Sequence, residues 1–157
     1  MRIGHGFDAH TFTEGRPLIL GGVTIPHDKG LKAHSDGDAV IHALCDAILG
    51  AAGLGDIGTY YPDTDKKFEN IDSRILLRDV INSISQKGYK IGNADITILA
   101  QAPKLLSHIP KMKKMLSDDM DIQLDEVNLK ATTTEGMGYV GREEGIAVYS
   151  VVILTYT

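Results

Sequence analysis

Two side chains that could bind a metal ion lie close together near the start of the chain, in the segment GFDAH. If this segment forms a β-strand, Asp8 and His10 project from one face, because alternate side chains of a strand point the same way. His42, which falls in a later helical pattern, could add a third ligand. One carboxylate and two imidazoles can provide the three protein ligands of an open tetrahedral zinc site, whose fourth position stays available for substrate or water. The first pair alone is a weak signal, so the prediction requires the strand and the helix to meet.

His42 lies in a polar row of the predicted helix, with Asp38 four residues before it and Asp46 four residues after it. Residues at this spacing share one face of an α-helix. A lone helical histidine is usually a surface or satisfied core residue, but two flanking carboxylates at the core boundary favour a ligand. Asp46 is predicted to orient a ligand imidazole from behind, as carboxylates often do, or else to be an exposed helix charge.

Two segments have features of anion binding. The segment AHSDGD lies where the first helix is expected to begin, and free N–H groups at a helix N-terminus attract phosphate. His34 and Ser35 would lie beside such an anion, although Ser35 with Asp38 also matches a capping box. The glycine-bracketed GDIG, residues 55–58, either brings backbone amides close to an oxyanion or forms a plain tight turn.

A third candidate phosphate site is the segment KATTTEG in the last third of the chain. Its hydroxyls and Glu135 suit a phosphate held through a hard cation such as magnesium, which prefers oxygen ligands and bridges phosphates. A run of threonines is also typical of an ordinary strand. With the other two segments, it indicates phosphoryl chemistry without defining the reaction.

The elements that must position these residues follow from the hydrophobic periodicity. The predicted strands and helices are strands over 1–10, 17–26, 91–101, 127–132 and 146–155, and helices from about 35, over 73–87 and over 110–120. The first two strands are expected to pair as a hairpin. The first helix is expected to begin at Ser35 or Asp36 and to end at Gly50 or Gly53. Residues 53–72 are polar and contain glycines and a proline, so no regular structure is expected there.

This order of elements predicts an α+β fold with a single mixed β-sheet that carries helices on one face. The final strand, AVYSVVIL, is apolar on both of its alternating faces, so both need cover. The helices can cover one face, and the chain has little left for the other. We therefore expect a subunit interface on the open face of the sheet.

Composition narrows the functional class. The chain of 157 residues fits one domain and has a net charge of −5, with basic residues scattered apart from KMKK, which argues against a nucleic-acid or membrane-surface role. The single cysteine, Cys45, cannot form an internal disulfide, and no apolar segment suits a membrane span or signal peptide. We expect a cytoplasmic protein of bacterial type, with an organelle-processed form as the alternative.

Taken together, the motifs resemble those of one family, the 2-C-methyl-D-erythritol 2,4-cyclodiphosphate synthases of the non-mevalonate isoprenoid pathway. The resemblance rests on GHGFDAH, LKAHSDGDAVIHALCDAILGAAGLGDIG, YPDTD, AQAPK and KATTTEGMGYVGREEGIA, in this order over nearly the whole chain. It implies a single synthase domain over residues 1–157 whose substrate is 4-diphosphocytidyl-2-C-methyl-D-erythritol 2-phosphate. The 2-phosphate would attack the β-phosphorus, expel CMP and close a cyclic diphosphate.

The resemblance also implies roles for individual residues. Asp8, His10 and His42 would bind zinc, and Glu135 would help to hold a second divalent ion, usually magnesium. His34 and Thr133 would position the transition state. The implied substrate contacts are Asp8, Ala9, His10, His34, Ser35, Asp56, Ile57, Gly58, Tyr61, Pro62, Asp63, Thr64, Asp65, Ala100, Gln101, Ala102, Pro103, Lys104, Leu105, Leu106, Thr132, Thr133, Thr134, Glu135, Tyr139 and Arg142.

Members of this family are homotrimers with the sheets packed around the trimer axis. Each active site lies between adjacent subunits, one giving the zinc and erythritol side and the neighbour the cytidine side. Some members bind an isoprenoid diphosphate in the central cavity, near the positions of Tyr139 and Arg142. This chain departs from the family at Tyr61 and Tyr139, where phenylalanine is common, and at Gly136, where lysine is frequent. The lost positive charge puts the diphosphate affinity or the cavity's ligand preference in doubt.

The glycines of GHGFDAH are expected to leave room for the substrate to approach. Two other functions fit parts of the pattern. A zinc phosphohydrolase would attack a phosphate ester with metal-bound water. A trimeric ligand-sensing module would use zinc structurally, so that His42→Ala would melt the trimer, whereas a catalytic zinc predicts a folded trimer without activity.

Overall fold

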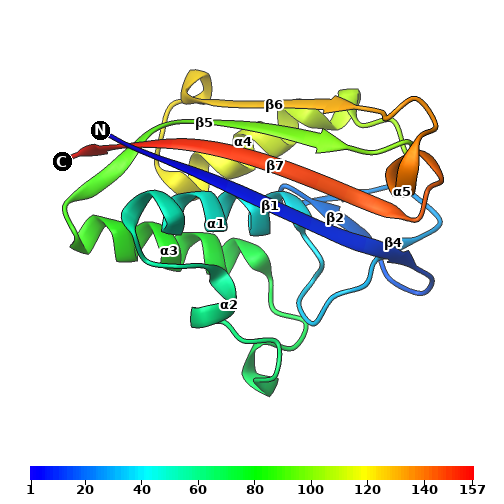
Figure 1. The fold of residues 1–157 in the computed structure, drawn as a ribbon, viewed down its shortest axis with the longest axis horizontal. Coiled ribbons are helices and arrows are strands. Elements are labelled where there is room, and N and C mark those ends of the chain that lie inside the picture. The colour runs from blue at the N-terminus through cyan, green and yellow to red at the C-terminus, as the bar shows by residue number, and fades with distance from the viewer.

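A five-stranded mixed sheet forms the centre of the computed structural model, which describes residues 1–157. The strands are, in sheet order, β4 (Gly30–Leu31), β1 (Arg2–Thr13), β7 (Gly145–Tyr156), β5 (Tyr89–Leu99) and β6 (Val127–Thr132). β5 and β6 run parallel and the other neighbours run antiparallel (Figure 1). The predicted mixed sheet is confirmed, but it is not the single sheet of the prediction, since residues 18–25 form a separate two-stranded sheet.

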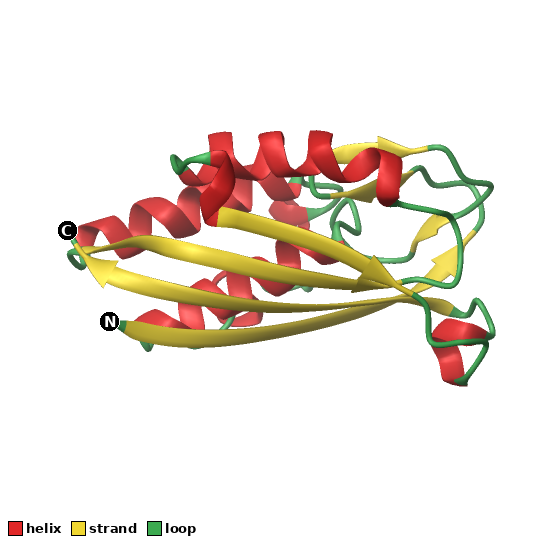
Figure 2. Cartoon of the chain, turned by 90° about the horizontal axis from the view of Figure 1, so that it is seen from above, coloured by secondary structure: helices red, strands yellow, loops and turns green.

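Three long helices, α1 (Ala39–Ala52), α3 (Ser73–Gln86) and α4 (Ile109–Met120), lie on one side of this sheet (Figure 2). Shorter helical turns are α2 (Ile57–Tyr60), η1 (Lys66–Phe68), η2 (Leu106–His108), η3 (Leu124–Glu126) and α5 (Gly138–Gly141). The α+β class with helices on one face is confirmed. Residues 53–72 contain α2 and η1, so the expectation of a wholly irregular segment is wrong. No helix has the length and apolar character needed to cross a membrane.

The expected hairpin between the first two extended segments is wrong. β1 pairs with β7 and β4, while the second segment folds on itself as β2 (Leu18–Leu20) and β3 (Val23–Ile25). The cause is the Gly21–Gly22 pair, whose positive φ values of 59° and 74° make a two-residue hairpin turn. The dipeptide is a recognisable turn signal in the sequence.

The start of α1 also differs from the prediction. Its N-cap is Asp38, whose carboxylate accepts hydrogen bonds from Ile41 N, Gly21 N and Gly22 N at 2.7–3.1 Å. Ser35, Asp36 and the capping box are therefore wrong as the helix start. Because Asp38 joins the β2–β3 turn to the helix, tertiary contacts set the helix start. Burial of Asp38 and the charge of Asp36 raise the pKa of Asp38 to about 6. The helix ends, as expected, at Gly53, which has a left-handed conformation.

α1 packs directly on β1 because two positions of the strand lack side chains. A Cβ at Gly4 would overlap the carbonyl oxygen of Ala47, and one at Gly6 would overlap that of Ala43. Both glycines lie in the row of β1 that ends in the two ligand candidates, as the alternation predicted. The expectation that they leave room for substrate is wrong, because the helix backbone occupies that space.

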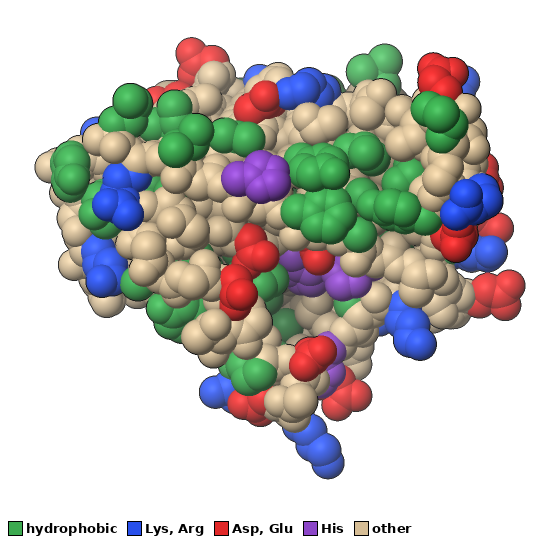
Figure 3. Space-filling model, in the orientation of Figure 1, with side chains coloured by type: hydrophobic (Ala, Val, Ile, Leu, Met, Phe, Trp, Pro, Cys, Tyr) green, Lys and Arg blue, Asp and Glu red, His purple; other side chains and the backbone are tan.

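The other face of the sheet has no cover within the chain. Phe7, Tyr149 and Val151 are 44%, 42% and 39% exposed, and Figure 3 shows apolar side chains gathered over β1 and β7. The opposite side of β7 is buried against the helices. This matches the prediction that the final strand is apolar on both faces, with only one covered by the chain's own helices.

Candidate metal centre and substrate cleft

The three predicted ligands meet where α1 crosses β1. His10 Nε2 and His42 Nδ1 lie 2.7 Å and 3.2 Å from Asp8 Oδ2, and the two nitrogens are 3.3 Å apart. One ligand atom from each residue falls within 4.8 Å of the others. Histidine and acidic side chains are visible together in the hollow below the strands in Figure 3. The strand and the helix therefore meet as the sequence prediction required.

The outer nitrogens of both imidazoles are already hydrogen-bonded. His10 Nδ1 lies 3.0 Å from the carbonyl oxygen of Lys32, so Nδ1 carries the proton and donates it. His42 Nε2 lies 2.9 Å from Ser73 Oγ. The inner nitrogens, His10 Nε2 and His42 Nδ1, hydrogen-bond to Asp8 and would exchange their protons for a metal ion. One carboxylate and two such imidazoles fit a divalent metal of the zinc type.

The electrostatics of the cluster support this arrangement. Burial alone would raise the pKa of Asp8, but hydrogen bonds and charge from His10 and His42 outweigh it and hold the pKa below its ordinary value. Burial alone would lower the pKa of His42, but the Asp8 carboxylate raises it above its ordinary value. The carboxylate therefore stays ionised and attracts positive charge into the site.

A cleft of about 770 Å³ opens onto the three ligands. His34 and Ser35 line one side, and α2 and the residues after it line the other. The predicted contacts that line it are Asp8, His10, His34, Ser35, Ile57, Gly58, Tyr61, Pro62 and Asp63. The cleft is also lined by residues that the sequence predictions missed. Lys32 and Ala33 lie within a quoted motif but received no role, and Phe68, Ile71 and Leu76 belong to no motif.

Hydrogen bonds hold residues 57–65, which lie beside the cleft, to the rest of the chain. His34 Nε2 donates to the carbonyl of Asp65 at 2.9 Å, and the Tyr61 hydroxyl donates to the Asp79 carboxylate on α3. Burial and Asp79 raise the pKa of Tyr61, so this hydroxyl keeps its proton. Phenylalanine, which is common at this position in the family, has no hydroxyl to form this bond. We call the Tyr61–Asp79 hydrogen bond the latch.

Removing this latch should loosen the segment without unfolding the protein. For Tyr61→Phe we expect amide exchange across residues 57–65 to accelerate about fivefold to tenfold, because one hydrogen bond contributes about 1 kcal/mol. Hydrogen–deuterium exchange with mass spectrometry measures this change. Tyr60→Phe is the matched control, since the Tyr60 hydroxyl has no hydrogen-bond partner in the structure. Equal exchange rates in both variants would contradict the latch.

Asp46 does not orient a ligand imidazole. Its carboxylate accepts a hydrogen bond of 2.8 Å from Ile57 N and so holds the start of α2 against α1. The hydroxyl of Ser73 takes the position behind His42 that the sequence prediction gave to Asp46. Asp46 does lie on α1 four residues after His42, as predicted, but its side chain points to the start of α2.

A second, separate pocket of about 240 Å³ takes in most of the predicted contacts over residues 100–106 and 132–135, but Ala102, Thr134 and Glu135 do not line it. It is lined by Ala100, Gln101, Pro103, Lys104, Leu105, Leu106, Ala131, Thr132 and Thr133. The strand register places it at the same end of the sheet as the metal ligands, since Ala9 and Leu99 both face Ala147, and Leu99 faces Thr132. In the sheet order, β7 and β5 lie between β1, which carries Asp8 and His10, and β6, which carries Thr132.

Glu135 and Thr133 are not brought to the three metal ligands within one chain. Glu135 is exposed, and its backbone N donates to Thr133 Oγ1 at 3.2 Å. Tyr139 lies with His10 on a third, small pocket, and Arg142 forms an ion pair of 2.8 Å with Glu144. Within one chain, the predicted site residues therefore line separate pockets.

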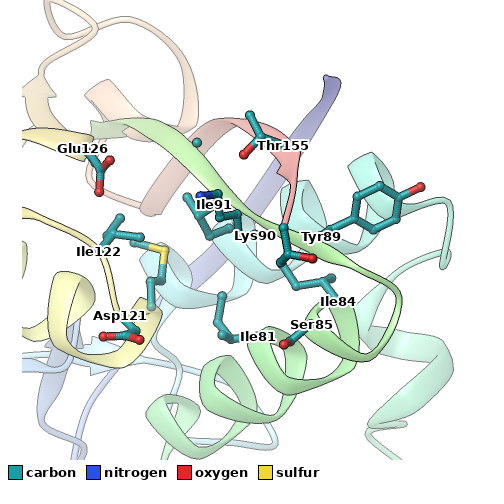
Figure 4. Close-up of a pocket in the computed structure, with 13 residues that line it drawn as sticks. Ile81, Ile84, Ser85, Tyr89, Lys90, Ile91, Asp121, Ile122, Glu126 and Thr155 are labelled. Atoms are coloured by element: carbon teal, nitrogen blue, oxygen red, sulfur yellow. The ribbon is translucent and has the colours of Figure 1, made fainter.

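Figure 4 shows a further hollow, of about 470 Å³, between α3, β5 and the end of α4. Isoleucines from these elements line it, among them Ile81, Ile91 and Ile122. Lys90, Asp121 and Glu126 contribute charge, but they do not form a metal-binding group. The candidate chemistry lies in the cleft and not in this hollow.

A model of the YgbB family matches residues 1–155. The chain belongs to the YgbB family. Relatives of this YgbB protein include the 2-C-methyl-D-erythritol 2,4-cyclodiphosphate synthases of Pseudomonas putida and Azotobacter vinelandii. They are 58% and 57% identical to it over 154 residues, which is 98% of this chain and 98% of each relative.

Solved structures give the same grouping for the YgbB chain. A 2C-methyl-D-erythritol-2,4-cyclodiphosphate synthase in a CDP-bound form has a TM-score of 0.90 and 40% identity, covering 98% of this chain and 100% of that one. The bifunctional IspDF of Campylobacter jejuni has a TM-score of 0.96 and 50% identity over 99% of this chain. The YgbB chain spans only 42% of that longer protein.

Proposed function

We propose that this YgbB-family chain is a cyclodiphosphate synthase that converts 4-diphosphocytidyl-2-C-methyl-D-erythritol 2-phosphate into 2-C-methyl-D-erythritol 2,4-cyclodiphosphate and CMP. The observation that carries the proposal is the convergence of Asp8, His10 and His42 at the floor of a cleft. Full-length relatives with the synthase name, one solved with CDP, support the nucleotide substrate.

The reaction needs positioning more than covalent chemistry. An oxygen of the 2-phosphate forms a bond to the β-phosphorus while the bond from that phosphorus to the CMP oxygen breaks, and no water is consumed. The chain must hold the two phosphates in line and stabilise the charge on the transferring group. His34, on the wall of the cleft, would position the transition state, and Ser35 beside it would hold the erythritol phosphate end.

The metal ions belong to the proposal. Asp8, His10 and His42 would hold zinc, which when bound supplies positive charge and Lewis acidity next to the diphosphate. Glu135 would contribute to a second divalent ion, magnesium, from the cytidine side. Thr133, which lines the second pocket, would position the transition state from that same side.

A homotrimer would complete the site. The metal cleft and the second pocket lie at the same end of the sheet, and the open apolar face over β1 and β7 offers the surface for packing sheets around an axis. A neighbouring subunit could then bring the cytidine pocket against the metal cleft. The unpaired sheet face and the divided site both support this assembly.

A charge on the open face should disrupt this assembly. We expect Val151→Asp to shift the protein towards monomer and to lose most of its activity, because a buried, unpaired charge costs about 3 kcal/mol or more. Sedimentation velocity at micromolar protein measures the change. Ile75→Asp on α3 is the control, since Ile75 is 49% exposed on the helical side and should leave the assembly intact. Loss of assembly in both variants, or in neither, would contradict the proposed interface.

A product assay tests the function itself. Purified protein with zinc and magnesium should release CMP and cyclic diphosphate in equal amounts from the diphosphocytidyl substrate. Phosphorus NMR distinguishes the cyclic product from open-chain phosphates. Hydrolysis products alone would overturn the synthase and favour a zinc phosphohydrolase. Binding without turnover would favour a ligand-sensing module.

A further inference from the structure

Ser73, the first residue of α3, lies directly behind His42. It is 0% exposed, and its Oγ lies 2.9 Å from His42 Nε2 and 2.6 Å from Asp36 Oδ1. Neither Ser73 nor Asp36 lines the cleft. The three side chains form a continuous row from a carboxylate, through a hydroxyl, to the candidate metal ligand.

The direction of the hydrogen bonds in this row is fixed by chemistry. A carboxylate only accepts, so the single hydroxyl proton of Ser73 is donated to Asp36. The oxygen of Ser73 then has only lone pairs for His42, and Nε2 must be the donor. Nδ1, which lies 3.2 Å from Asp8 Oδ2, is thereby the nitrogen whose lone pair would serve a bound metal ion.

Asp36 is held firmly enough to set this direction. Its carboxylate accepts hydrogen bonds from the backbone N of Ser73 at 2.9 Å and from that of Asp38 at 3.1 Å, in addition to the Ser73 hydroxyl. These contacts join the start of α1 to the start of α3. A metal-ligating histidine whose other nitrogen is fixed in this way keeps its tautomer and ring orientation.

Ser35 approaches the same nitrogen but is placed differently. Its Oγ lies 3.1 Å from His42 Nε2, accepts from Gly37 N at 3.3 Å and faces the cleft. Because Ser73 accepts the Nε2 proton at the shorter distance, the Ser35 hydroxyl proton stays available for an anion in the cleft.

We propose that Asp36 and Ser73 are positioning residues that fix the His42 tautomer and set the metal affinity, whereas Ser35 acts on the substrate. The inference rests on the proposed metal site. Ser73 and Ser35 both lie beside His42 Nε2, but the proposal gives them different functions. Replacing each with alanine should therefore produce different defects.

The test compares Ser73→Ala with Ser35→Ala on metal-free protein titrated with Zn²⁺ against a chromophoric chelator. We expect Ser73→Ala to bind Zn²⁺ about 10-fold to 100-fold more weakly, with activity recovered at high Zn²⁺. Ser35→Ala should bind Zn²⁺ within about threefold of wild type and show a raised KM that added Zn²⁺ does not correct. A purely structural role for Ser73 would lower the melting temperature of the metal-free protein without this metal rescue.

Asp36→Asn gives an independent second variant, because it keeps the size of the side chain but weakens the acceptor for the Ser73 hydroxyl. We expect its Zn²⁺ affinity to lie between those of wild type and Ser73→Ala. This variant decides the question if Ser73→Ala does not fold. Wild-type Zn²⁺ affinity in either folded variant, or a larger loss in Ser35→Ala, would overturn only the positioning role of Asp36 and Ser73. Absence of Zn²⁺ binding by the wild type would overturn the metal site itself.

Discussion

Asp8→Asn should reduce the rate of CMP release about 10²-fold to 10³-fold, the usual cost of removing one electrostatic contact at a reacting group. The change keeps the size of the side chain but removes the negative charge that lies against both His10 and His42. A neutral amide oxygen is a poor ligand for a divalent cation, so bound zinc should fall as well. Steady-state kinetics and metal analysis of the purified variant measure both effects.

The control for this variant is another aspartate next to a histidine. Asp28 lies 3.3 Å from His27 on the surface, where it is 80% exposed, so Asp28→Asn should keep full activity and zinc content. Wild-type activity in Asp8→Asn would contradict the proposed centre. If Asp8→Asn instead loses its assembly and unfolds on heating far below the wild type, the zinc is structural and the ligand-sensing alternative gains support.

Gly6→Ala should destabilise the protein by about 3 kcal/mol or more, because overpacking of this kind forces the backbone to move. The added methyl group would overlap the carbonyl oxygen of Ala43 and lie 2.8 Å from the N of Ala47, both on the helix backbone. Separation of α1 from β1 would also move His42 away from Asp8. Urea denaturation of the metal-free protein measures the change in unfolding free energy.

A glycine-to-alanine change on the helix should have the opposite sign. Gly50 lies within α1, is exposed and has space for a Cβ, whose nearest neighbour would be the carbonyl oxygen of His5 at 4.0 Å. Gly50→Ala should therefore stabilise the protein by up to about 1 kcal/mol. Wild-type stability in Gly6→Ala would show that β1 and α1 can separate without cost. It would contradict the conclusion that their close packing brings His42 to Asp8.

Hydrophobic periodicity was enough to find the main elements. α3 and α4 begin and end within about one residue of the predicted limits, and β6 matches the predicted range. Periodicity could not find the start of α1, because Asp38 is fixed as its cap by the β2–β3 turn, far along the chain. It also missed that hairpin, although Gly21–Gly22 was a local signal for it.

The candidate ligands were also predictable, because their chemistry is carried by residue type. Aspartate and histidine two residues apart on a strand must share a face, and Asp8 and His10 do. That His42 joins them was only a condition of the prediction. It is met because Gly4 and Gly6 let α1 approach the strand backbone, a contact between segments about 40 residues apart.

The sequence by itself therefore determined which groups are available for chemistry, the periodicity of the elements, and the family to which the motifs belong. Only the tertiary structure decided how these groups are used. It placed Ser73 rather than Asp46 behind His42, assigned the N-terminal glycines to helix packing, and distributed the predicted contacts over separate pockets. The physical reason is that side-chain type and periodicity are local properties, whereas hydrogen-bond partners and close approach depend on segments that meet only in the folded chain.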